Sequence, residues 1–154
     1  MAATLDSSKG TAVVPHDSIA AGVMQAAAAT QGLRDIASLR TAAADLVDAA
    51  MSVGCHDLVA ANAAAEPLTT AAALLSDGKL GYSDIRHTTA QKVLIVDAAT
   101  VSGDVTRSCA GYLRENGAMW IGAIIYERVR PDLDGLDVEP TLDCVISLRP
   151  RLNE

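Results

Sequence analysis

The sequence KVLIVDAATVSGDVTRSCAGYLRENG, residues 92–117, decides the fold class of this chain. Residues 93–96 are an unbroken run of aliphatic side chains, which is typical of a strand buried on both faces of a parallel sheet. Asp97 closes the predicted strand, and residues 98–101 form a short loop. Apolar side chains then recur at helical spacing, so we predict a helix over residues 102–113.

Strands and helices alternate on both sides of this unit. Further strands are predicted at residues 57–61, 120–126 and 144–148, and helices at residues 19–31, 33–51 and 66–75. Such alternation indicates a parallel sheet covered by helices. We therefore expect an α/β protein with a single Rossmann-like domain over residues 17–150, including N-terminal helices, and a flexible tail over residues 1–16.

Composition and charge exclude several classes of protein. The chain has 12 basic and 19 acidic residues, a net charge of −7, which disfavours binding to nucleic acid or to an anionic membrane. Its three cysteines are widely spaced and form no CxxC pair, so we expect reduced thiols and no metal site. The sequence has neither a signal peptide nor an apolar stretch of about 18 residues, which predicts a cytoplasmic protein.

Ligands of open parallel sheets bind beyond the carboxyl ends of the strands. Asp97 is the first candidate there, because a carboxylate beside a buried strand needs a partner. Arg128 and Arg130 follow the predicted strand 120–126 and could reach a phosphate or a base, although we favour a solvated loop for both. The predicted loops at this edge cover residues 62–66, 97–104 and 127–136.

The stretch of residues 92–117 resembles the phosphoribosyl-pyrophosphate motif of type I phosphoribosyltransferases, most closely the orotate branch. In that motif an apolar strand ends in one or two acids, and a turn rich in Thr and Gly opens a helix. The likeness extends over roughly residues 33–148, although its specific motif is about a dozen residues long. It implies a Rossmann-like parallel sheet flanked by helices, with the ligand bound at the turn.

The resemblance assigns roles to individual residues. Asp97 matches the acid that orients the ribose, which makes it the catalytic candidate, and Ser102 and Gly103 match the turn that binds the 5′-phosphate. Turn amides and a helix N-terminus suit a phosphate, and an acid accepts hydrogen bonds from ribose hydroxyls. The remaining candidates around the phosphate are Thr100, Asp104 and Thr106.

The sequence also departs from the family pattern. Ala98 replaces the second acid, and Asp104 introduces a carboxylate where the family has Gly or Thr. Residues 62–66, which match the pyrophosphate loop, contain no Gly, Lys or Arg. The segment before the strand at residue 93 is too short for the usual catalytic hairpin, and it leaves Lys79 and Arg86 as candidates for contacting the leaving group.

The resemblance thus implies a phosphoribosyltransferase-like protein of nucleotide metabolism that binds phosphoribosyl pyrophosphate or a nucleotide 5′-phosphate. It implies transfer of the phosphoribosyl group to a nucleobase with Mg²⁺ if the chain is active, and a homodimer as the usual assembly. The departures favour an alternative, a catalytically inactive binding or regulatory module of the same fold. A structural role, with the alanine-rich helix at residues 19–31 facing another chain, stays open.

Overall fold

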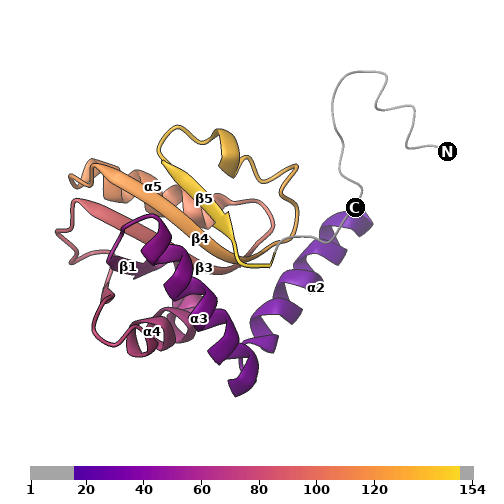
Figure 1. Cartoon of the computed structure of the whole chain (residues 1–154). Helices are drawn as coiled ribbons and strands as arrows, with labels where there is room; N and C mark the ends of the chain where they lie inside the picture. Colours follow the sequence, from indigo (N-terminus) through magenta and orange to yellow (C-terminus); the bar gives the residue numbers. More distant parts are fainter. Residues whose placement is uncertain (1–15, 150–154) are drawn as a thin grey trace.

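The computed structural model describes residues 16–149, with side chains from residue 19 onward (Figure 1). Its centre is a five-stranded, all-parallel sheet with the strand order β2-β1-β3-β4-β5. This confirms the predicted α/β class with a Rossmann-like sheet. The strands are β1 (Asp57–Ala60), β2 (Gly81–Ser83), β3 (Lys92–Thr100), β4 (Trp120–Arg128) and β5 (Cys144–Ser147).

Within residues 16–149, four α-helices and two short 3₁₀ helices accompany the sheet. Helices α3 and α4 lie side by side on one face, α5 covers the other face, and α2 forms a V with α3 (Figure 1). The helices are α2 (His16–Gly32), α3 (Ile36–Ser52), α4 (Glu66–Leu75) and α5 (Asp104–Glu115), with 3₁₀ helices η1 (Ala63–Ala65) and η2 (Leu136–Val138). Within residues 16–149, no helix is both long and apolar enough to span a bilayer.

The core is divided by the central strand β3. Leu94 and Val96 pack toward α3 and α4, whereas Val93 and Ile95 pack toward α5. All four side chains are fully buried, because consecutive strand residues point to opposite faces and helices cover both. The aliphatic run that predicted this strand is therefore the middle of the core.

Several boundaries differ from the prediction. Strand β3 does not stop at Asp97 but continues to Thr100, since residues 97–100 keep pairing with β4. Helix α3 begins at Ile36, because Asp35 caps it and its carboxylate accepts a 3.0 Å hydrogen bond from the Ser38 N–H. Strand β2 was missed altogether, as it has three residues and no apolar run.

Helix α2 approaches the carboxyl end of the central strands. A Cβ atom at Gly22 would lie 3.4 Å from the Val101 side chain, so the absent side chain allows close approach. Gln25 Nε2 donates a 2.8 Å hydrogen bond to Glu127 Oε2 near the end of β4. The helix begins at His16, and the rest of the predicted tail, residues 1–15, lies outside the described residues.

Candidate functional site at the carboxyl edge of the sheet

The strand order places a topological switch point between β1 and β3. The chain leaves β1 toward β2 on one side and leaves β3 toward β4 on the other, and ligands of open α/β sheets bind at such points. Two turns meet there, residues 61–65 and residues 101–103, which we call the β1–α4 turn and the β3–α5 turn. The predicted phosphate-binding residues all belong to the second turn or flank it.

The β3–α5 turn is held by its own hydroxyl groups. Gly103 caps α5 with a φ of 78°, a left-handed conformation that favours glycine. Its N–H donates to Thr100 Oγ1 at 2.8 Å, and the Asp104 N–H donates to Ser102 Oγ at 3.2 Å. The side chains of Ser102 and Asp104 are exposed, so they face any ligand that reaches this end of the sheet.

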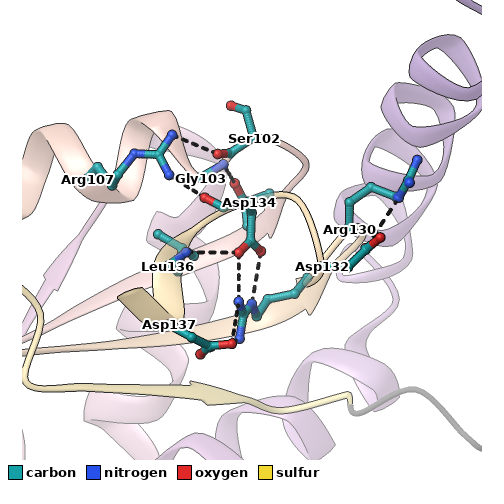
Figure 2. A network of polar contacts seen from close by, with 10 residues as sticks. Ser102, Gly103, Arg107, Arg130, Asp132, Asp134, Leu136 and Asp137 are labelled. Carbon is teal, nitrogen blue, oxygen red and sulfur yellow. Dashed lines mark hydrogen bonds and ion pairs between the residues drawn. The ribbon is translucent and has the colours of Figure 1, made fainter. Parts of the chain in front are cut away.

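Arg107 lies in the first turn of α5, three residues after Asp104, and adds a positive charge to the β3–α5 turn (Figure 2). Its guanidinium donates to the Ser102 carbonyl oxygen at 2.9 Å and to Asp104 Oδ1. It also donates to the carbonyl oxygen of Asp134, which belongs to the loop after β4. Arg107 therefore joins the two ends of the turn to a distant loop, a role that was not predicted although Asp104 and Arg107 are spaced for a helical ion pair.

The loop after β4 is built on a buried ion pair (Figure 2). Arg128 contacts both carboxylate oxygens of Asp134, at 3.0 and 2.7 Å, and the two side chains are 7% and 0% exposed. Asp137 adds a 3.2 Å contact, and the Leu136 N–H donates to Asp134 at 3.1 Å. The hydrogen bonds that Arg128 donates to the Asp134 carboxylate raise the pKa of Arg128, which keeps the guanidinium charged.

This ion pair corrects our interpretation of Arg128. The residue is the last of β4 and is buried, rather than part of a solvated loop. Arg130 remains partly exposed and lies 3.6 Å from Asp132. The pair brings the Asp134 carbonyl oxygen to 2.7 Å from the position of a Cβ atom at Gly103, so the loop packs directly on the β3–α5 turn.

Asp97 lies beneath the β3–α5 turn. Its side chain points to the α5 face of the sheet and is 2% exposed, and Oδ2 accepts a 3.1 Å hydrogen bond from Thr106 Oγ1. Burial raises the pKa of the Asp97 carboxyl, while the hydrogen bonds from Thr106 and from the Ala99 and Ala98 N–H groups oppose that shift. The structure thus brings Asp97 and Thr106 together as a buried pair.

The β1–α4 turn opens onto a pocket of about 360 Å³. Asn62 Oδ1 accepts a 3.2 Å hydrogen bond from the Ala65 N–H, and the chain continues into α4 with Pro67 in its first turn. Arg86 lines this pocket together with Asn62 and Glu66. Its exposed ion pair with Asp84, at 3.2 Å, lowers the pKa of that carboxyl to about 2.

The two candidates for leaving-group contacts are separated by the sheet. Arg86 follows β2 and lies at the carboxyl edge, next to the predicted pyrophosphate loop. Lys79 precedes β2 and lies at the amino edge, because all five strands are parallel. Among residues 16–149, no three His, Cys, Asp or Glu side chains gather as ligands for a metal ion. The predicted edge site therefore retains Arg86 and excludes Lys79.

Comparison with known proteins adds nothing to this geometry. Neither the known protein families nor the curated proteins include a match to this chain. The candidate site consequently rests on the two turns and the residues that surround them.

Proposed function

We propose that the protein binds a phosphoribosyl ligand, phosphoribosyl pyrophosphate or a nucleotide, with the 5′-phosphate at the β3–α5 turn. The observation that carries the proposal is this turn: Gly103 opens α5 at the switch point of the sheet, and the Arg107 guanidinium lies beside it. Backbone amides at a helix N-terminus attract anions, and arginine matches phosphate geometry well. The motif resemblance and the position of the turn support the same ligand.

Asp104 has a specific part in this proposal. Its exposed carboxylate accepts a hydrogen bond from the Arg107 guanidinium. A phosphate oxygen would accept a hydrogen bond from the same group. A bound phosphate would therefore compete with Asp104 for Arg107. The competition weakens binding without blocking it, because the Asp104 side chain is 74% exposed and free to turn toward solvent.

Binding rather than transfer is the function we infer. Asp97, the catalytic candidate, is 2% exposed and engaged by Thr106, so it supports the turn from below. A carboxylate that held ribose hydroxyls would have to reach the surface. Mg²⁺ enters this proposal as part of the ligand, bound to its diphosphate. We assign the protein to the cytoplasm, where such ligands occur and where its free cysteines stay reduced.

A second candidate is transfer of the phosphoribosyl group. The pocket beside the β1–α4 turn supports it, since Asn62 and Arg86 line a space of about 360 Å³ next to the switch point. A diphosphate leaving group there would be stabilised by Arg86. If the wild type releases pyrophosphate when nucleobases are added, and Arg86→Ala abolishes this release, transfer is supported. If the ligand binds but no nucleobase causes release, the protein is a binding module.

Isothermal titration of phosphoribosyl pyrophosphate with Mg²⁺ tests the proposal. We expect a dissociation constant of about 10–100 μM for the wild type, as for a few charge-assisted contacts. Ser102→Glu places a negative charge on the exposed turn and should weaken binding about tenfold. Asp104→Asn releases Arg107 and should tighten binding about threefold. Ribose 5-phosphate should compete with the ligand, and adenosine should not.

A matched control separates the turn from general charge effects. Asp77 is an exposed acid at the opposite edge of the sheet, between α4 and β2, and Asp77→Asn changes the net charge by the same amount as Asp104→Asn. The Asp77→Asn variant should bind phosphoribosyl pyrophosphate with the affinity of the wild type. No heat at about 1 mM ligand, or equal tightening in both variants, would refute a phosphate site at the β3–α5 turn.

A further inference from the structure

A second surface lies on the outer side of α3 and α4, away from the β3–α5 turn and bordering the β1–α4 turn at Ala63 and Ala64. Figure 1 shows the two helices that carry it. Two hollows of about 400 and 160 Å³ share Leu39 and together form what we call the α3–α4 groove. The larger hollow lies between the α2–α3 turn and Pro67, and the smaller one between Ile36 and Leu74. The groove follows the outer stripe of η1 and α4.

The floor of the groove is apolar and exposed. Ile36 is 65% exposed, Leu74 77% and Leu75 47%. On η1 and α4 the lining side chains at positions 63, 67, 71 and 74 recur at helical spacing, and every one is apolar. Scattered apolar side chains on a surface are common, but a contiguous set beside a hollow marks an interaction site.

Two arginines at the rim of the groove form no ion pair with the described acidic residues, 16–149. Residues 16–149 contain eight arginines, and six of them form ion pairs within that part of the chain. The two that form none are Arg34, which lines the larger hollow, and Arg40, which lines the smaller one. Among the residues that the structure describes, no acidic side chain lines either hollow. In a chain of net charge −7, this leaves a local positive rim around an apolar floor.

We propose that the α3–α4 groove binds an amphipathic helix of another protein, with acidic residues along its flank. A helix presents apolar side chains at three- and four-residue steps, which match the stripe on α4. Acidic residues beside that stripe would meet Arg34 and Arg40 at the rim, and complementary charges select such a partner from others. The groove is separate from the β3–α5 turn, so the inference stands independently of the proposed ligand.

A second copy of this chain fits the groove less well. The exposed apolar side chains Ile19, Val23 and Met24 lie on α2, which carries no charged residue from 18 to 32. Such a face would cover the floor but leave both arginines without partners. An anionic membrane is disfavoured by the overall negative charge of the protein and by the concave shape of the surface.

Fluorescence anisotropy with two synthetic peptides tests the proposal. Both are helices of about 18 residues with the same leucine stripe, one flanked by Glu and the other by Lys. We expect saturable binding of the Glu peptide and binding of the Lys peptide about tenfold weaker. Leu74→Glu should weaken binding of the Glu peptide about tenfold. The double variant Arg34→Glu, Arg40→Glu should reverse the preference between the two peptides.

The variants are exposed, so the fold should survive, and matched controls are present. Met119 is 74% exposed on the chain leading into β4, and Met119→Glu should leave peptide binding unchanged. Lys79→Glu is the control for the change of charge and should also leave peptide binding unchanged. Lack of Glu-peptide binding at about 1 mM, or equal loss in the controls, would overturn the proposal. So would a homodimer that Leu74→Glu dissociates, or binding of the wild type to phosphatidylglycerol vesicles that both groove variants abolish.

Discussion

The β1–α4 and β3–α5 turns occupy equivalent places at the switch point, yet they are stabilised differently. In the first, the side-chain contacts are local: Asn62 caps a 3₁₀ turn and Thr69 Oγ1 donates to the Ala65 carbonyl oxygen at 2.7 Å. Its first residue, Ala61, is also tied to neighbouring elements, because its N–H donates to the Val96 carbonyl oxygen at 2.8 Å and its own carbonyl oxygen accepts from Cys109 Sγ at 3.6 Å. In the second, Arg107 reaches a carbonyl oxygen 27 residues away, in the loop built on Arg128. The β3–α5 turn alone is joined by a guanidinium to the loop after β4, in addition to the hydroxyl contacts within it.

This difference has a physical consequence for the site. The β1–α4 turn faces an open pocket on the side of Asn62 and Glu66. The β3–α5 turn is packed between the buried Asp97 below and the Asp134 loop beside it, so its backbone is held in one arrangement. A preorganised backbone loses less entropy when an anion binds, which is why we assign the phosphate to this turn.

The largest expected effect comes from removing the distant support. Asp134→Ala leaves Arg128 buried with only the exposed Asp137, and breaking a buried pair from one side costs about 3–5 kcal/mol. Urea unfolding followed by circular dichroism measures this loss of free energy of unfolding. Replacing both partners, Arg128→Leu with Asp134→Leu, should recover part of it, because no charge stays buried.

Arg86→Ala is the comparison change in the pocket beside the β1–α4 turn, where the ion pair is exposed rather than buried. Its ion pair with Asp84 is exposed on both sides, so the unfolding midpoint should stay where it is in the wild type. Equal destabilisation by Asp134→Ala and Arg86→Ala would contradict the greater weight given to the buried pair behind the β3–α5 turn.

The next effect isolates the contact between the turn and the loop. Gly103 and Gly78 both have positive φ, 78° and 84°, so alanine is strained at either position. A Cβ atom at Gly103 would also lie 2.7 Å from the Asp134 carbonyl oxygen, whereas nothing lies within 4 Å at Gly78. We expect Gly103→Ala to cost about 3 kcal/mol and Gly78→Ala about 1 kcal/mol.

Thermal and urea unfolding of both glycine variants provide the comparison. The difference between them measures the packing of the loop on the β3–α5 turn, since the backbone strain is common to both. If the two variants lose the same free energy of unfolding, the loop yields to the added methyl group and the turn is less tightly held than we infer.

The sequence predicts the apolar framework well and the polar connections poorly. The strands around Val93 and Ile121 were found because buried parallel strands are continuous aliphatic runs, and α4 was found from Pro67 and its helical spacing. The aliphatic run ends at Val96, so Asp97 was predicted to close the strand, whereas the strand continues to Thr100. The burial of Asp97 depends on Thr106, nine residues later, and no local pattern reveals that contact.

The ion pair of Arg128 illustrates the same limit over a longer range. Four acids, at positions 127, 132, 134 and 137, lie within nine residues of Arg128 in the sequence, and spacing does not select Asp134 among them. The path of the loop after β4 makes that selection, and the path depends on Gly135 and the 3₁₀ helix that follows it. Arg107 could have been found from its helical spacing to Asp104, but its contact with Asp134 could not.

The smallest expected effect concerns the charge beneath the β3–α5 turn. Burial raises the pKa of Asp97 in the folded chain, so the folded state holds this proton to higher pH than the unfolded state does. The Asp97 contribution to the free energy of unfolding is therefore fully present below the unfolded pKa, about 3.9, and is lost as pH rises through the raised value. The asparagine of the Asp97→Asn variant does not titrate, so the variant does not lose free energy of unfolding in this way as pH rises.

Urea unfolding of wild type and Asp97→Asn between about pH 4 and 7 measures the difference. Other carboxyls, such as Asp84 and Asp143 with lowered pKa values, act with the opposite sign but are common to both proteins and cancel. The stability of the variant should rise relative to the wild type as pH increases. Thr106→Val removes a hydrogen bond that opposes the shift, so it should extend the decline to higher pH. Parallel curves would mean that Asp97 is hydrated, and the β3–α5 turn would then rest on the Asp134 loop alone.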